Sequence, residues 1–122
     1  MKIAIDGKEY GIHFGVGFVR ELDKVHFVEG KNGVRFGAGL ETTLPLILTG
    51  DIVTLSDYLY YGTCAEESRP TRNQVDAYVD GVEDADQLLA EVTEELKKPH
   101  ATRKSVEMYL KIFAKQNPEK NE

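Results

Sequence analysis

Residues 1–14 read MKIAIDGKEYGIHF, and their apolar side chains recur every second residue on both sides of the pair Asp6-Gly7. Strict alternation is typical of half-buried strands, and an Asp-Gly pair between two such runs is typical of a two-residue type I′ turn. This turn sets Ile3 opposite Tyr10, whereas a loop one residue later would set Asp6 opposite Glu9, two like charges. The sequence therefore predicts an N-terminal β-hairpin. Its apolar face must be covered by helices or by another chain, because an isolated hairpin is marginally stable in water.

Beyond residue 14 the apolar period changes from two to about 3.6, which predicts a series of amphipathic helices. The expected stripes are Phe18, Leu22 and Val25; Leu40, Leu44, Ile47 and Leu48; Leu55, Tyr58 and Leu59; Val75, Tyr78, Val79 and Val82; Ala85, Leu88, Leu89, Val92 and Leu96; and Val106, Tyr109, Leu110 and Phe113. We predict an α+β fold, an N-terminal β-hairpin followed by a small bundle of about five helices. We expect residues 1–115 to form a single domain and residues 116–122 to form a flexible C-terminal tail.

Local signals suggest where some of these elements begin. Pro45 removes one helical hydrogen bond, so the second helix either starts near Thr43 or kinks at the proline. Thr54 begins a Thr-x-x-Asp capping box and is expected to cap the third helix, as Thr71 is expected to cap the fourth. Residues 28–37 contain three glycines and are expected to form a loop, with a second small hairpin as the alternative.

Two segments, 14–22 and 36–44, share the pattern Phe-Gly-x-Gly-apolar-x-x-x-Leu, and each precedes a predicted helix. One pair of copies is too few for a solenoid. The pattern is also a poor dinucleotide fingerprint, because the third glycine position is Arg20 in one copy and Thr42 in the other. We interpret both segments as junctions at which glycine lets the chain turn sharply into a helix.

Composition excludes several classes of protein. The 122 residues suffice for one ordinary domain, and a net charge of −6 with a pI near 5.1 is the wrong sign for a domain that neutralises nucleic-acid phosphates. No apolar run approaches the ~20 residues of a membrane span, and the N-terminus lacks the continuous apolar stretch of a signal peptide. The single cysteine, Cys64, cannot form an internal disulfide, so the cytosol is the expected compartment.

No motif for catalysis, a cofactor or a metal emerges from the chain. His13, His26 and His100 stand outside any metal-ligand spacing, and Cys64 lacks a nucleophile signature. The acidic residues between Asp76 and Asp86 do not reproduce a calcium-loop spacing and fit solvated helix surface and helix N-termini better. We therefore expect a protein that is not an enzyme and has no cofactor.

The middle of the chain carries more apolar surface than one small core needs. Leu46 and Ile52 fall off the stripes of their neighbours, and Tyr60 and Tyr61 point to other sides of their helix than Tyr58 does. Two interpretations fit equally well: a central helix buried on both sides, or a docking surface, since tyrosine is enriched in both settings. Leu46, Ile52, Tyr60 and Tyr61 are therefore the candidate partner-binding residues.

The whole chain resembles the tail assembly chaperones of siphophages and prophages of Gram-positive bacteria. The resemblance rests on MKIAIDGKEY running into FGVGFVRELDK (1–10 and 14–24), FGAGLE followed by LPLILTGD (36–41 and 44–51), VTLSDYL (53–59), and the acidic region that ends in Lys-Lys (80–98). It implies a protein that binds the tape measure protein and keeps it soluble while the tail tube assembles around it. The family offers no catalytic residues.

The resemblance also implies a place of action and further partners. Such chaperones act in the cytoplasm of the bacterial host and are generally absent from the mature virion. Many have a longer, frameshifted form that recruits the tail tube protein, and this chain would be the short form. Self-association is expected as well, since symmetric dimers are the commonest oligomers. The alternative function is a minor structural tail or head-tail joining component that stays in the virion.

Overall fold

The structure is a computed structural model that describes residues 1–116, and the first two elements are the predicted hairpin. Strand β1 (Lys2–Ile5) pairs antiparallel with β2 (Lys8–Gly11), with Ile3 opposite Tyr10. Asp6 and Gly7 have φ values of 52° and 80°, as a type I′ turn requires. The predicted register is therefore confirmed.

The apolar face of this hairpin is covered by helices of the same chain. Ile3, Ile5, Tyr10 and Ile12 are all buried, and β1 packs against α4 (Arg72–Gly81). The backbone N–H of His13 donates to the carbonyl of Gly62, at the end of α3, over 2.9 Å. Of the two predicted covers, helices or another chain, the structure shows the first.

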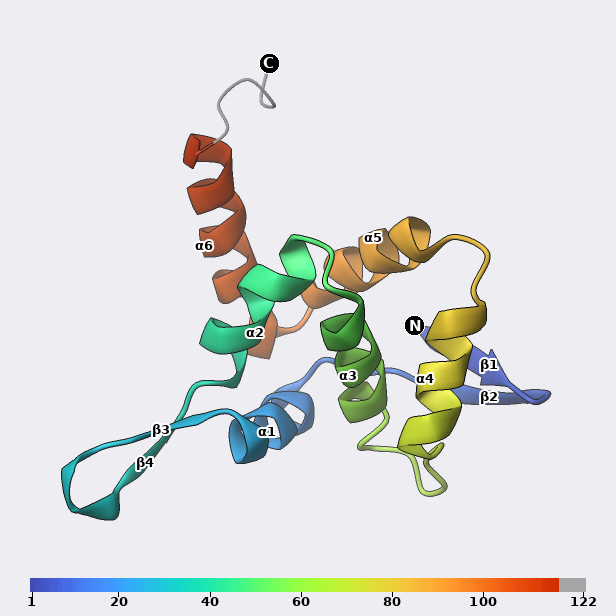
Figure 1. Ribbon diagram of the computed structural model, residues 1–122, viewed down its shortest axis with the longest axis horizontal. Coiled ribbons are helices and arrows are strands. Elements are labelled where there is room, and N and C mark those ends of the chain that lie inside the picture. Colours follow the sequence, from blue (N-terminus) through green and yellow to red (C-terminus); the bar gives the residue numbers. More distant parts are fainter. Residues whose placement is uncertain (117–122) are drawn as a thin grey trace.

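Helices make up most of the described chain (Figure 1). They are α1 (Val16–Val25), α2 (Gly39–Leu48), α3 (Ile52–Gly62), α4, α5 (Ala85–Leu96) and α6 (His100–Gln116). The described residues thus contain six helices, close to the five or so expected, and the α+β prediction is confirmed. The predicted tail 116–122 lies outside the described residues except for Gln116, which ends α6.

The core forms where these helices meet around α3. Tyr58 is fully buried, and its ring packs edge-on against Phe18 of α1 with ring centres 4.9 Å apart. Most residues of the predicted stripes belong to this core or pack against it, but Val25 and Leu110 are exposed. Val25 is the last residue of α1, and Leu110 lines an open groove that α6 forms with α2 and α5.

Residues 28–37 form a second hairpin rather than a loop. Strand β3 (Phe27–Glu29) pairs antiparallel with β4 (Arg35–Gly37) across the short 3₁₀ helix η1 (Lys31–Gly33). The chain reverses at Asn32 and Gly33, which both have positive φ, a conformation that asparagine and glycine tolerate better than other residues. The loop prediction was wrong, and the hairpin alternative is confirmed.

Pro45 lies inside α2, which begins at Gly39 and not near Thr43. A proline has no N–H, so the carbonyl of Glu41, four residues earlier, loses its usual helical donor. The hydroxyl of Tyr109 in α6 donates to that carbonyl over 3.4 Å. The packing of α6 on α2 therefore supplies a partner for the group that the proline leaves free.

The start of α3 also differs from the prediction. Asp51 caps the helix, because its carboxylate accepts from the backbone N–H of Thr54 at 2.9 Å and from the Thr54 hydroxyl at 2.6 Å. Gly50, with φ of 95°, ends α2 just before this cap. The cap expected at Thr54 was wrong, whereas the cap expected at Thr71 of α4 is confirmed as a full capping box with Gln74.

The glycines of the second Phe-Gly-x-Gly segment permit a close approach rather than a sharp turn. Neither Gly37 nor Gly39 has a positive φ. A Cβ atom at Gly39 would lie 2.5 Å from the Cβ of Leu22, while its N–H donates to the Asp23 carboxylate at 2.9 Å. These glycines let the start of α2 lie directly against α1.

Candidate partner-binding surfaces

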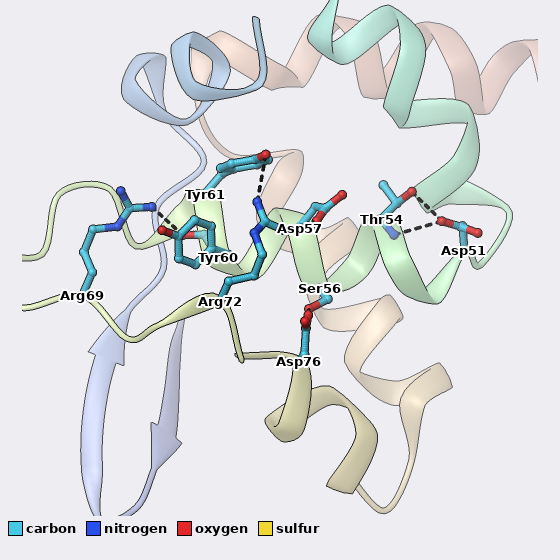
Figure 2. Close-up of polar contacts among 9 residues, drawn as sticks. All are labelled: Asp51, Thr54, Ser56, Asp57, Tyr60, Tyr61, Arg69, Arg72 and Asp76. Carbon is cyan, nitrogen blue, oxygen red and sulfur yellow. Dashed lines mark hydrogen bonds and ion pairs between the residues drawn. The ribbon is translucent and has the colours of Figure 1, made fainter. Parts of the chain in front are cut away.

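Tyr60 and Tyr61 pack against two arginines (Figure 2). The guanidinium groups of Arg69 and Arg72 lie 4.6 and 4.7 Å from the centre of the Tyr60 ring. Tyr61 is only 7% exposed, and its hydroxyl accepts a hydrogen bond from Arg72 over 3.0 Å. Both rings are thus engaged in cation–π and hydrogen-bonding contacts within the chain.

The same arginines connect the segment 63–72 to α1 and α3. Arg72 forms an ion pair with Asp57 at 2.6 Å, and Arg69 donates to the backbone carbonyl of Tyr60 at 3.0 Å and pairs with Glu21 of α1 at 3.5 Å. For the two tyrosines, the arrangement matches the interpretation of a central helix packed on both sides.

Leu46 and Ile52, by contrast, are solvent-exposed, by 46% and 42% respectively. Both lie at the corner between α2 and α3, where the Asp51 N–H donates to the Leu46 carbonyl over 3.0 Å. Val53 next to them is exposed as well. We call Leu46, Ile52 and Val53 the corner patch. Of the four candidate residues, two therefore lie on an accessible apolar surface.

A shallow groove of about 310 Å³ runs from the corner patch between α3 and α4. Its acidic side chains are Asp57, Asp76 and Asp80. Ser56 donates to the Asp76 carboxylate within this groove, and Arg72 pairs with Asp57 (Figure 2). Two of the three carboxylates in the groove, Asp57 and Asp76, therefore already have partners across α3 and α4.

A second exposed apolar surface was missed by the sequence analysis because residues 28–37 were interpreted as a loop. Phe27, Val28, Val34 and Phe36 of the β3–β4 hairpin are all exposed, Phe36 by 59%, and the hairpin projects from the body of the molecule (Figure 1). Val28, Val34 and Phe36 share one face, because Val28 is opposite Phe36 and Val34 lies two residues before it, and we call these three residues the hairpin patch. The alternation of Val34 and Phe36 was the signal that predicted paired strands with one apolar face.

The third surface lies along the second half of α6, which also projects from the body (Figure 1). Met108, Leu110 and Ile112 are exposed there. A groove of about 740 Å³ separates this part of α6 from α2 and α5, and we call it the α6 groove. The spacing of Met108 and Ile112, four residues apart and off the predicted stripe, was the sequence signal that was overlooked.

Among residues 1–116, no three His, Cys, Asp or Glu side chains cluster as metal ligands, and no helix is long and apolar enough to cross a membrane. The pKa of Tyr58 is strongly raised by burial, but its hydroxyl is hydrogen-bonded to Thr43 at 2.6 Å. This tyrosine is a core residue rather than a reactive group.

A sequence model of the phage tail assembly chaperone proteins matches residues 2–110. The chain belongs to the phage tail assembly chaperone family. The family resemblance of the sequence is thereby confirmed, and so is a role in phage tail assembly. No curated protein and no solved structure matches the chain. In this tail assembly chaperone the matched region contains the corner patch, the hairpin patch and most of α6.

Proposed function

We propose that this tail assembly chaperone binds the tape measure protein of its phage and keeps it soluble while the tail tube assembles around it. The match to the chaperone family over residues 2–110 carries the proposal. The role is one of binding, without catalysis. This role requires accessible apolar surface on the chaperone. A long helical protein that the tail tube does not yet surround exposes apolar stripes, and these stripes cause it to aggregate.

The exposed surfaces of the chaperone are consistent with such a role. A typical soluble monomer exposes apolar residues singly, whereas the corner patch and the hairpin patch each group several of them, and several apolar side chains line the α6 groove. Groups of this kind mark sites of protein interaction. The chaperone thus exposes grouped apolar surface, which the binding of a tape measure helix requires.

Co-expression of the chaperone with the tape measure protein of the same phage tests the proposal. We expect the soluble yield of tape measure protein to rise and the two chains to purify together. Tape measure protein expressed alone, and with a chaperone destabilised in its core by Phe18→Ala, provides the baseline. If intact chaperone neither raises the yield nor purifies with its partner, the proposed function is wrong.

We further propose that the chaperone acts in the cytoplasm of the bacterial host and leaves before the virion is complete. Mass spectrometry of purified virions tests this, since a stoichiometric amount of the chain would favour the alternative, a structural component of the tail. A longer form that recruits tail tube protein would appear in the same measurement on infected cells. Self-association stays a prediction, and light scattering over a range of concentrations tests it.

A further inference from the structure

The second half of α6 is apolar on more than one side. Val106 anchors the helix in the core, Leu110 and Phe113 follow on the same side, and Met108 and Ile112 lie on another. A helix that is apolar on several sides is normally buried. Here it extends away from the body of the molecule (Figure 1), so its outer turns lack a cover within the described chain.

The α6 groove has the form of a trough with walls from three helices. The end of α2 contributes Leu48, α5 contributes Leu89, and α6 contributes Leu110 and Phe113. Thr49, Thr93 and Gln116 add polar groups, and the other side chains of the lining are apolar. Amphipathic helices bind to proteins in apolar grooves of this kind, with residues at helical spacing as anchors.

Charge along the chain distinguishes α6 from its neighbours. Helix α6 carries Arg103, Lys104, Lys111 and Lys115 against one acidic residue, Glu107, although the whole chain has a net charge of −6. Residues 72–96, by contrast, carry eight acidic side chains and one basic one. Within the described chain, neither Lys111 nor Lys115 forms an ion pair, and both are exposed beside the groove-lining Leu110 and Ala114.

We propose that the α6 groove binds an amphipathic helix with an acidic edge. Its apolar stripe covers Leu48, Leu110 and Phe113, and its acidic side chains lie beside Lys111 and Lys115. The inference rests on the proposed function in taking the tape measure protein as the source of this helix. A groove walled by three helices fits a rod-shaped partner better than the flat surface of a membrane.

Two double variants of the chaperone test the groove. Leu110→Ser with Phe113→Ser removes apolar lining, and Lys111→Glu with Lys115→Glu reverses the charge beside it. All four positions lie outside the buried core, so we expect both variants to keep the wild-type circular dichroism and melting temperature. On co-expression, we expect the amount of tape measure protein that purifies with each variant to be at least about tenfold lower than with the wild type.

Matched variants on the β3–β4 hairpin and at the end of α1 serve as controls. Val28→Ser with Phe36→Ser makes the same kind of change at two apolar side chains that are more exposed than Leu110 and Phe113, and Lys24→Glu with Lys31→Glu makes the same change in net charge elsewhere. We expect both to bind tape measure protein as the wild type does. Raising the salt from about 0.1 to about 1 M, which shortens the Debye length from about 10 to about 3 Å, should weaken wild-type binding more than that of the Lys111→Glu, Lys115→Glu variant.

The outcomes separate the inference from the function on which it rests. If the wild type and both α6 variants bind equally, the groove assignment is wrong and the chaperone function stands. The same holds if only the hairpin variants lose binding of tape measure protein. It also holds if the α6 variants bind tape measure protein as the wild type does but sediment less than the wild type with vesicles of anionic phospholipid. A wild-type chain that binds no tape measure protein overturns the proposed function and the groove assignment together.

Discussion

Gly39 stands where α2 begins against α1, and the two backbones leave no room there for a side chain. A Cβ atom at this position would lie 2.5 Å from the Leu22 Cβ and 3.0 Å from the Leu22 carbonyl carbon. We expect Gly39→Ala to lower the free energy of unfolding by about 1–3 kcal/mol, because the helices must move apart. Gly81→Ala is the matched control in urea denaturation, since a Cβ atom there meets nothing within 4 Å. Equal stability of both variants would contradict the close approach.

Tyr58 and Thr43 form a buried hydrogen-bonded pair in which the two partners are not equivalent. The hydroxyl groups are 2.6 Å apart, and the Thr43 hydroxyl also donates to the Gly39 carbonyl at 2.7 Å. Tyr58→Phe leaves Thr43 with that acceptor and should cost about 1 kcal/mol. Thr43→Val leaves the tyrosine hydroxyl buried without a partner and should cost about 1–3 kcal/mol. Urea denaturation of the two variants checks the order, and a larger cost for Tyr58→Phe would reverse the assignment.

The same tyrosine makes stability depend on alkaline pH. Burial raises the pKa of Tyr58 far above the usual value of about 10, while its hydrogen bond with Thr43 opposes part of the rise. Above pH 10 the unfolded chain loses this proton and the folded chain keeps it, so the free energy of unfolding falls as the pH rises.

Tyr58→Phe should therefore lose less stability than the wild type between about pH 9 and pH 11, as measured by urea denaturation at each pH. Some dependence remains in this variant, because burial and the charge of Glu91 also raise the pKa of Tyr78. If wild type and Tyr58→Phe lose stability equally over this range, Tyr58 is not buried as described.

Among the elements, the start of α3 shows why a boundary can be missed from sequence. Asp51-x-x-Thr54 and Thr54-x-x-Asp57 both have capping spacing, so spacing alone does not choose between them. The choice follows from Gly50, whose left-handed conformation ends α2 and lets α3 begin at once. The N-terminal hairpin was predictable with its register because Asp6-Gly7 admits one turn without opposing like charges.

The cap itself leads to a prediction. We expect Asp51→Ala to cost about 1 kcal/mol of unfolding free energy at neutral pH, and Asp51→Asn less, because asparagine also accepts at this position. Hydrogen bonds from the Thr54 hydroxyl and backbone N–H lower the pKa of Asp51. The stabilisation by the carboxylate is therefore present above the unfolded pKa of about 3.9 and is lost as the pH falls through the lower folded value.

Urea denaturation between about pH 6 and pH 3 separates the cap from other carboxylates. We expect Asp51→Asn to lose less stability than the wild type on acidification. Thr54→Ala removes the side-chain donor to Asp51 but leaves the backbone donor. Its loss of stability on acidification should therefore lie between that of the wild type and that of Asp51→Asn. Identical acid dependence of wild type and Asp51→Asn would show that Asp51 does not cap α3 as a carboxylate.

For the molecule as a whole, the surface that remains open depends on contacts between distant segments. Periodicity placed Tyr60, Tyr61, Leu46 and Ile52 off the core stripes alike, and only the first two are packed within the chain. The difference comes from Arg69 and Arg72, whose long side chains lie over the tyrosines from the loop and from α4. The tertiary fold decides which residues such long side chains contact, and the spacing of residues in the sequence does not predict these contacts.

The separation of one core from projecting apolar surfaces gives a last prediction. The side chains of the hairpin patch do not belong to the core, so Val28→Ser with Phe36→Ser should change the free energy of unfolding by no more than about 0.5 kcal/mol per site. Phe18→Ala, which empties a fully buried position, should cost about 3–5 kcal/mol in the same urea titration. If the hairpin variant loses stability only at high protein concentration, a second copy of the chain covers the patch in solution. An equal loss at every concentration would instead show that the hairpin packs against its own chain.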